Sequence, residues 1–489
     1  MAEQPMLKFV KIERDMPEKR DATIRREDFA EIYAEYADTK AKEQSSRCSQ
    51  CGVPYCQTHC PLHNNIPDWL RLTAEGRLQE AYEVSQATNT FPEICGRICP
   101  QDRLCEGNCV IEQSGHGTVT IGSVEKYITD TAWENGWVLP IKPAVERVES
   151  VGIIGAGPGG LAAADVLRRA GVQVTVYDRY DRAGGLLTYG IPGFKLEKDV
   201  VMRRNEQLEQ GGVKFELNCD VDADVFASIQ AEHDAIIIAT GVYKSRDLSL
   251  HGSQAQGVEK AIDFLTASNR KSFGDAVEEF DSGRYNAEGK RVVVIGGGDT
   301  AMDCVRTSIR QGATSVKCLY RRDRANMPGS QRELQNAEEE GVVFEWLSAP
   351  KGFTTDLAVT DVSDPNDPAG RVTGVMVQKM RLGAPDATGR QAPEVIEGAD
   401  YVEDADLVIK ALGFEPEALP TLWDQPELEV TRWGTIKAAH TTGKTQMDGV
   451  YAVGDIVRGA SLVVWAIRDG RDCAEAILEQ FSATAIAAE

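Results

Sequence analysis

Two glycine-rich turns, each between a short apolar strand and a helical segment, constrain the fold of this chain more than any other feature. The first reads GAGPGG at 155–160, after the apolar run 151–154, and the second reads GGGDTA at 296–301, after 292–295. A tight turn from a parallel strand into a helix N-terminus is typical of dinucleotide-binding βαβ units. We therefore predict an α/β protein with two Rossmann-like, doubly wound dinucleotide-binding domains.

The first turn carries the glycines that such a site needs. Gly155 allows the tight turn, Gly157 lets the backbone approach a pyrophosphate, and Gly160 permits close packing of helix on strand, with Pro158 in the same turn. Asp178 ends the next strand, where a carboxylate can accept a hydrogen bond from a ribose 2′-hydroxyl. We therefore expect this site to bind an adenosine that carries no 2′-phosphate.

The second turn differs at the matching strand end. The turn itself contains Gly296, Gly298, Asp299 and Thr300. No acid follows the next strand; Arg321 and Arg322 stand there instead, and guanidinium groups can bind a 2′-phosphate bidentately. A solvated surface pair is the alternative, but the contrast within one chain favours FAD at the first turn and NADPH at the second.

Later apolar strands complete the two units. One at 235–239 leads into Thr240 and Gly241, and another at 405–411 leads into glycine. The dipeptide Gly454-Asp455 follows 450–453; in two-module flavoproteins such an aspartate reaches the flavin ribityl chain, although alone it would be only a turn. We expect an FAD domain at 146–285 and 411–489, and an NADPH domain at 286–410.

Eight of the 12 cysteines lie between positions 48 and 109, in a region with helical periodicity at 66–87. Thiolates two to four residues apart can converge on one metal centre, and the two Cys-Pro pairs resemble the end of a ferredoxin run, although the first group departs from the ferredoxin spacing by two residues. We therefore predict a mainly helical iron–sulfur domain at 1–145 with two 4Fe–4S clusters. Zinc is the rival metal, because Cys-x2-Cys is also half of a zinc ribbon. Zinc has no redox chemistry, and a flavin reductase needs one-electron outlets.

Composition excludes some classes of partner. The chain has 53 basic and 76 acidic residues and a net charge of −23, so nucleic acid is not an expected partner. No apolar run reaches about 18 residues, and the first 30 residues lack an apolar core of signal-peptide length. We expect a cytoplasmic protein that does not span a membrane.

Several longer stretches resemble one family over nearly the whole chain. They include CGVPYCQTHCPLHNNIPDW, EICGRICPQDRLCEGNC, GGLLTYGIPGFKLEK, GGGDTAMDCVRTSIRQGA and YAVGDIVRGASLVVWAI. Together they are similar to the small (beta) subunits of bacterial NADPH-dependent glutamate synthases. The resemblance implies that Gly185, Leu186, Ser461 and Val463 also bind FAD.

The same architecture occurs in the N-terminal half of dihydropyrimidine dehydrogenase, and this relationship implies interleaved cluster ligands. One cluster would take Cys48, Cys51, Cys56 and Cys109, and the other Cys60, Cys99 and Cys105. The fourth ligand of the second cluster stays open. Glu125 stands at the position of a glutamine ligand in dihydropyrimidine dehydrogenase, whereas Cys95 offers a thiolate, the better iron ligand in general.

The resemblance also implies a function. NADPH would reduce FAD, and electrons would pass through the clusters to a large (alpha) subunit that carries FMN and a glutaminase and forms L-glutamate from L-glutamine and 2-oxoglutarate. The first alternative is an NADPH:ferredoxin-type or bifurcating subunit with another acceptor; a zinc-binding interaction protein is the second. A thioredoxin reductase-like enzyme would need a redox Cys-x-x-Cys, and Cys304 and Cys318 are not so spaced.

Overall fold

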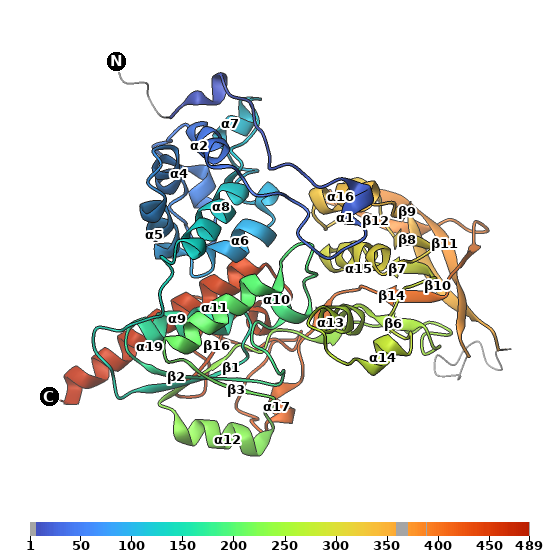
Figure 1. Cartoon of the computed structure of the whole chain (residues 1–489). Helices are drawn as coiled ribbons and strands as arrows, with labels where there is room; N and C mark the ends of the chain where they lie inside the picture. The colour runs from blue at the N-terminus through green and yellow to red at the C-terminus, as the bar shows by residue number, and fades with distance from the viewer. Residues whose placement is uncertain (1–5, 358–369, 388, 489) are drawn as a thin grey trace.

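In the computed structural model, the two glycine-rich turns lie at the ends of strands in two separate parallel sheets (Figure 1). The structure describes residues 6–357, 370–387 and 389–488. A helical region at the N-terminus packs above the first sheet, and the second sheet lies to one side. The predicted α/β class, with two doubly wound units behind a helical region, is confirmed.

The first sheet has the strand order β16-β4-β1-β2-β3, with all neighbours parallel. Its strands are β1 (Ser150–Ile154), β2 (Gln173–Asp178), β3 (Lys214–Leu217), β4 (Ala235–Ile238) and β16 (Val450–Ala452). The helices around it are α9 (Pro158–Arg169), α10 (Leu186–Tyr189), α11 (Lys198–Gln210), α12 (Ala223–Glu232), α17 (Leu419–Leu422), α18 (Asp455–Arg458) and α19 (Val463–Ala488). All four residues of β4 are buried, as a strand covered on both faces requires.

The second sheet repeats this plan in the order β6-β14-β7-β8-β9. Its strands are β6 (Val258–Lys260), β7 (Arg291–Ile295), β8 (Ser315–Tyr320), β9 (Val343–Trp346) and β14 (Leu407–Lys410), and its helices are α13 (Ala261–Ser272), α14 (Glu278–Asp281), α15 (Asp299–Arg310) and α16 (Gln331–Glu339). Alternate residues of β7 face opposite sides: Val292 and Val294 pack with the helices, Val293 and Ile295 with an antiparallel sheet. That sheet consists of β10 (Ser348–Thr355), β11 (Val372–Pro385), β12 (Gln391–Val395) and β13 (Tyr401–Asp404).

The chain crosses between the two sheets twice, and the crossings pair with each other. β5 (Lys244–Ser245) leaves the first sheet after β4, and β15 (Phe414–Glu415) returns after β14 as its antiparallel partner. The second sheet is therefore built from residues inserted between β4 and β16 of the first.

The N-terminal region is mainly helical. It contains α2 (Asp38–Ser46), α3 (Tyr55–Thr58), α4 (Ile66–Ala74), α5 (Leu78–Thr88), α6 (Pro92–Ile98), the 3-10 helix η2 (Gln101–Arg103), α7 (Val110–Gln113) and α8 (Ile121–Glu134). The periodicity at 66–87 belongs to two helices, because Gly76 with φ 77° ends the first of them. None of the helices in the described ranges is long and apolar enough to cross a membrane.

Two tertiary contacts differ from the expected division of the chain. β6 lies before the boundary expected at residue 285, yet it pairs with β14 in the second sheet. A three-residue strand has too few side chains to show a periodicity. In addition, α1 (Ala22–Arg25) leaves the N-terminal region and lies against α16 (Figure 1), where Arg25 donates to the buried Glu340 at 2.9 Å.

Candidate cofactor-binding sites

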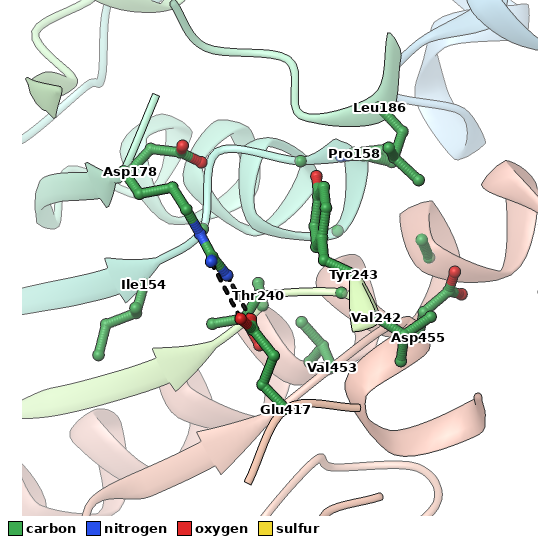
Figure 2. Close-up of a pocket in the computed structure, with 18 of the residues that line it drawn as sticks. Ile154, Pro158, Asp178, Leu186, Thr240, Val242, Tyr243, Glu417, Val453 and Asp455 are labelled. Atoms are coloured by element: carbon green, nitrogen blue, oxygen red, sulfur yellow. Dashed lines mark hydrogen bonds and ion pairs between the residues drawn. The ribbon is translucent and has the colours of Figure 1, made fainter. Parts of the chain in front are cut away.

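A cavity of about 400 Å³ opens where β1, β2, β4 and β16 end at the carboxyl edge of the first sheet (Figure 2). Of the residues predicted to bind FAD, it is lined by Gly155, Gly157, Pro158, Asp178, Leu186, Thr240, Gly241, Gly454, Asp455, Ser461 and Val463. Segments that lie far apart along the chain thus meet at one cavity. Its position is the one where open parallel sheets bind ligands.

Gly160 and Gly185 do not line this cavity, and contacts around both leave little room for a side chain. A Cβ on Gly160 would lie 2.1 Å from the carbonyl oxygen of Gly155, so only glycine lets α9 approach the strand. Gly185 has φ 54°, and its Cβ would lie 3.0 Å from Cα of Gly157. A Cβ on Gly157, by contrast, would meet nothing within 4 Å, which leaves the backbone open to a ligand.

The polar groups of the cavity fit a dinucleotide. Asp178 accepts hydrogen bonds from the backbone N–H of Ala156 at 2.7 Å and of Tyr180 at 2.9 Å, and burial raises its pKa. The Thr240 hydroxyl is buried and has no hydrogen-bond partner among the described residues. A buried hydroxyl without a partner costs free energy unless a ligand supplies one.

Asp455 lies on the other side of the cavity from Asp178 (Figure 2). Its carboxylate accepts from the hydroxyl of Ser461 at 2.6 Å and from the Ser461 N–H at 3.2 Å, and burial raises its pKa. Both aspartates are therefore held in place by neighbouring N–H or O–H donors before any ligand binds. This is the preorganisation that a tight cofactor site needs.

An ion pair in the cavity lining was not predicted. Arg179 Nη1 donates to Glu417 Oε1 at 3.1 Å, and the Arg179 guanidinium carbon lies 5.4 Å from the centre of the Tyr243 ring (Figure 2). Tyr243 comes just before β5 and Glu417 just after β15, so the pair ties both crossings to the end of β2. Arg179 and Glu417 are 238 positions apart, so no local sequence pattern could predict their contact.

The second turn has the same backbone geometry as the first. Gly296 has φ 146°, and its Cβ would lie 2.2 Å from the carbonyl oxygen of Ala411, as that of Gly155 would lie 2.4 Å from Ala239 O. Gly298 is the N-cap of α15, and its Cβ would meet nothing within 4 Å. Thr300 follows in the first turn of α15. The positive end of a 12-residue helix thus faces an open backbone.

Arg321 and Arg322 follow β8 as predicted, beside this turn. Arg321 is exposed, whereas Arg322 donates from Nη2 to the carbonyl of Gln391 at 2.8 Å. The Nε of Arg322 is buried and has no partner among the described residues, so it can serve a phosphate. Asp299 instead accepts from the Ser330 N–H at 2.9 Å, and its carboxylate positions the 328–330 segment.

The eight clustered cysteines form two sets, each lining its own small cavity, and none of the eight forms a disulfide. The first set is Cys48, Cys51, Cys56 and Cys109. The second is Cys60, Cys95, Cys99 and Cys105, with Glu125 in the same lining. Within the described ranges, no three metal-binding side chains converge closely enough to hold one ion.

Both candidates for the eighth ligand lie in the second cavity. Glu125 Oε1 accepts from the side-chain amides of Asn64 at 3.0 Å and Asn89 at 3.2 Å, and burial raises its pKa to about 8. The Cys95 sulfur lies 3.8 Å from the Asn89 amide oxygen. Burial also raises the pKa of Cys60 to about 12, so thiolates here need a positive centre such as an iron cluster.

Two family comparisons divide the chain at the same place as the fold. Residues 25–137 match the family described as dihydropyrimidine dehydrogenase domain II, 4Fe-4S cluster. Residues 149–470 match the pyridine nucleotide-disulphide oxidoreductase family.

Curated relatives match over almost the full chain. The glutamate synthase [NADPH] small chain of Azospirillum brasilense is 64% identical over 478 residues, 98% of this chain and 96% of the relative. The protein of that name from Escherichia coli K12 is 45% identical, over 97% and 98% of the two chains. Among solved structures, Mycobacterium tuberculosis FprA in complex with NADPH superposes with a TM-score of 0.55 at 20% identity, over 70% of this chain and 87% of that chain, and shows the fold.

Proposed function

The chain belongs to the glutamate synthase [NADPH] small-chain family, and on that premise we propose that it is the electron-input subunit of a glutamate synthase. It oxidises NADPH at FAD and passes electrons through two 4Fe–4S clusters to a large subunit that carries FMN and a glutaminase. That subunit forms L-glutamate from L-glutamine and 2-oxoglutarate. One observation carries the proposal: a single chain holds two dinucleotide turns and two thiol-lined cavities.

The residues of the first cavity would hold FAD by its polar parts. Gly157 and the N-terminus of α9 would bind the pyrophosphate, Asp178 the adenosine ribose, and Thr240 and Asp455 the flavin end. When bound, FAD accepts two electrons as a hydride and can release them singly, which no side chain here can do. The protein's part is to bind, orient and exclude water.

The residues of the second turn would hold NADPH in the same manner. Gly298 and the first turn of α15 would receive the pyrophosphate. Arg321 and Arg322 would bind the 2′-phosphate and so select NADPH over NADH. We expect Arg321→Ala to weaken the binding of NADP⁺ while leaving that of NAD⁺ unchanged.

The two thiol sets would each hold one cluster. Cys48, Cys51, Cys56 and Cys109 would bind the first, and Cys60, Cys99 and Cys105 part of the second. Glu125 is the fourth ligand that we favour, because two amides hold it in the cavity. Cys95 is the alternative. Iron content and electron paramagnetic resonance of Glu125→Ala and Cys95→Ala proteins decide between them.

Purification identifies the electron acceptor. We would isolate the tagged chain anaerobically from its native host and identify the proteins that come with it. A stoichiometric, larger chain with FMN, and loss of glutamine-dependent glutamate formation when the small chain is removed, would support the proposal. Recovery alone or with a ferredoxin-like protein, and undiminished glutamate formation, would refute it.

One relative favours a second candidate, an electron-transfer subunit with another acceptor. The putative oxidoreductase AegA of Escherichia coli K12 is 45% identical over 95% of this chain, but the match covers only 69% of that protein. The same cofactor scaffold therefore occurs in a longer protein that does not bear the glutamate synthase name. The purification above separates the two candidates by the acceptor recovered.

A further inference from the structure

A short element of the N-terminal iron–sulfur region, η2, contacts the second dinucleotide turn. η2 lies between Cys99 and Cys105, two proposed ligands of the second cluster. The last residue of η2 is Arg103. Its Nη1 donates a hydrogen bond to the carbonyl of Pro328 at 3.1 Å, and its Nη2 lies 3.6 Å from Oδ2 of Asp299. A cation from another domain therefore lies at the rim of this turn.

Both partners of Arg103 are built into the turn itself. Asp299 is the first residue of α15 and accepts from the Ser330 N–H. Gly329, next to Pro328, donates its N–H to the carbonyl of Gly297 at 3.0 Å, and its Cβ would lie 3.1 Å from the same oxygen. The 328–330 segment thus lies directly on the loop where a pyrophosphate would bind, and Arg103 is attached to both.

The charges at this rim need a cation. The Asp299 carboxylate is favourable at a helix N-terminus, but it would repel the pyrophosphate that the same N-terminus binds. Arg103 lies close enough to offset that charge. Its side chain is 44% exposed and that of Asp299 is 43% exposed, so the guanidinium is accessible to a ligand arriving from solvent.

The base of η2 is fixed as well. Arg332 of α16 donates from Nη2 to the side-chain oxygen of Gln101 at 2.8 Å. Gln101 in turn donates to the carbonyl of Cys95 at 2.9 Å in the wall of the second thiol cavity. Arg103 is therefore presented to the turn by an element anchored on both sides, at little cost in conformational entropy on binding.

We propose that Arg103 binds the pyrophosphate of NADPH, so that the iron–sulfur region completes the second dinucleotide site. This inference rests on the proposed binding of NADPH at that turn. Guanidinium is suited to the role because it forms paired hydrogen bonds with phosphate oxygens. A site shared between two domains also forms only when both are in their folded arrangement.

The test titrates the wild-type and variant holoproteins with NADP⁺ and monitors binding by the change in flavin absorbance. Arg103→Ala should raise the Kd for NADP⁺ about 5- to 20-fold, the loss of one charge-assisted contact at a half-exposed site. Arg77→Ala is the matched control, since Arg77 is 47% exposed at the N-cap of α5, and should leave the Kd unchanged. Because Arg103 stands between proposed cluster ligands, variants are compared at equal iron content, and Arg103→Lys should show a smaller loss.

A truncated ligand separates a direct contact from a structural effect. 2′-AMP carries the 2′-phosphate and adenosine but no pyrophosphate, so Arg103→Ala should leave its Kd, measured by competition, unchanged. Equal weakening of 2′-AMP and NADP⁺ would mean that Arg103 only shapes the turn, and would overturn the proposal. An unchanged Kd for NADP⁺ would overturn it as well.

A third variant, Arg321→Ala, tests separately whether NADPH binds at the second turn at all. Arg321→Ala should weaken both ligands if NADPH binds at this turn. If it does so while Arg103→Ala has no effect, the role of Arg103 is wrong and the NADPH site stands. If Arg321→Ala changes neither Kd, NADPH binds elsewhere and the premise itself is wrong.

Discussion

Replacing Glu340 with glutamine should loosen the joint between the N-terminal region and the second sheet. Glu340 follows α16 and accepts five hydrogen bonds, at 2.7–3.1 Å, from Arg25, Arg306 and Arg310. The Glu340 side chain is fully buried and each arginine side chain is at most 1% exposed. Phe194 lies beneath two of the guanidinium groups, 4.3 and 4.0 Å from its ring centre.

The magnitude follows from the pKa of this carboxyl. Burial acts to raise the pKa of Glu340, but the hydrogen bonds and charges of Arg306 and Arg310 outweigh it and hold it at about 2, against a usual 4.5. That gap corresponds to roughly 3 kcal/mol of stability, in line with the ~3–5 kcal/mol expected for breaking a buried ion pair. Because the folded pKa is the lower one, this stability is complete above pH 4.5 and is lost as the pH falls towards 2.

Hydrogen exchange of the α16 backbone amides measures the effect locally, which suits a multidomain protein that does not unfold in two states. At pH 7 we expect Glu340→Gln to speed exchange roughly 100-fold, the equivalent of about 3 kcal/mol. The adjacent Glu339 is the control: it pairs with Arg25 at 2.7 Å but is 32% exposed, so Glu339→Gln should cost less than ~1 kcal/mol. Equal exchange rates in the two variants would refute the reasoning. So would a ratio of exchange rates between Glu340→Gln and the wild-type protein that changes between pH 6 and 8.

Three other predictions test the cofactor sites. Gly160→Ala should disrupt the fold, because its Cβ would lie 2.1 Å from a backbone oxygen. Gly157→Ala should fold but bind FAD about tenfold more weakly, and circular dichroism and flavin content distinguish the two variants. Glu417→Gln breaks the ion pair in the cavity lining and should speed FAD dissociation roughly 2- to 5-fold by flavin fluorescence, and an unchanged rate would show that the pair does not retain FAD. Cys56→Ala should halve the iron content while Cys304→Ala, in the core of the second sheet, leaves it intact; equal iron in both would contradict the first ligand set.

The sequence was most informative where a short stretch of backbone decides the structure. Gly155 and Gly296 could be recognised because each stands between a strand and a helix. In the structure both have positive φ, and a carbonyl oxygen lies too close to leave room for a Cβ. At both turns the residues that determine the geometry are adjacent along the chain. The segment 411–489 was expected to complete the first unit, and within it β16 pairs with β4.

Contacts between distant segments were not predicted. Arg25 and Glu340 are 315 positions apart, and Arg179 and Glu417 are 238 apart, so periodicity cannot pair them. Charged side chains in loops usually read as solvated surface, yet Arg25 is 1% exposed. The sheet that β6 joins was not predicted either, since it is set by its neighbour β14 and not by its own three residues.

The insertion of one sheet within the other has a consequence for biosynthesis. About 210 residues separate the end of β4 from the start of β16, so on the ribosome the second unit emerges whole before the first receives its edge strand. At about 5–20 residues per second this leaves some ten to forty seconds in which the nascent first sheet has an unpaired β4 edge and lacks the 453–463 wall of its cavity. A chain stalled before residue 450 would carry a finished second turn and an open first cavity, so we expect flavin to bind only after the 450–463 segment has been translated.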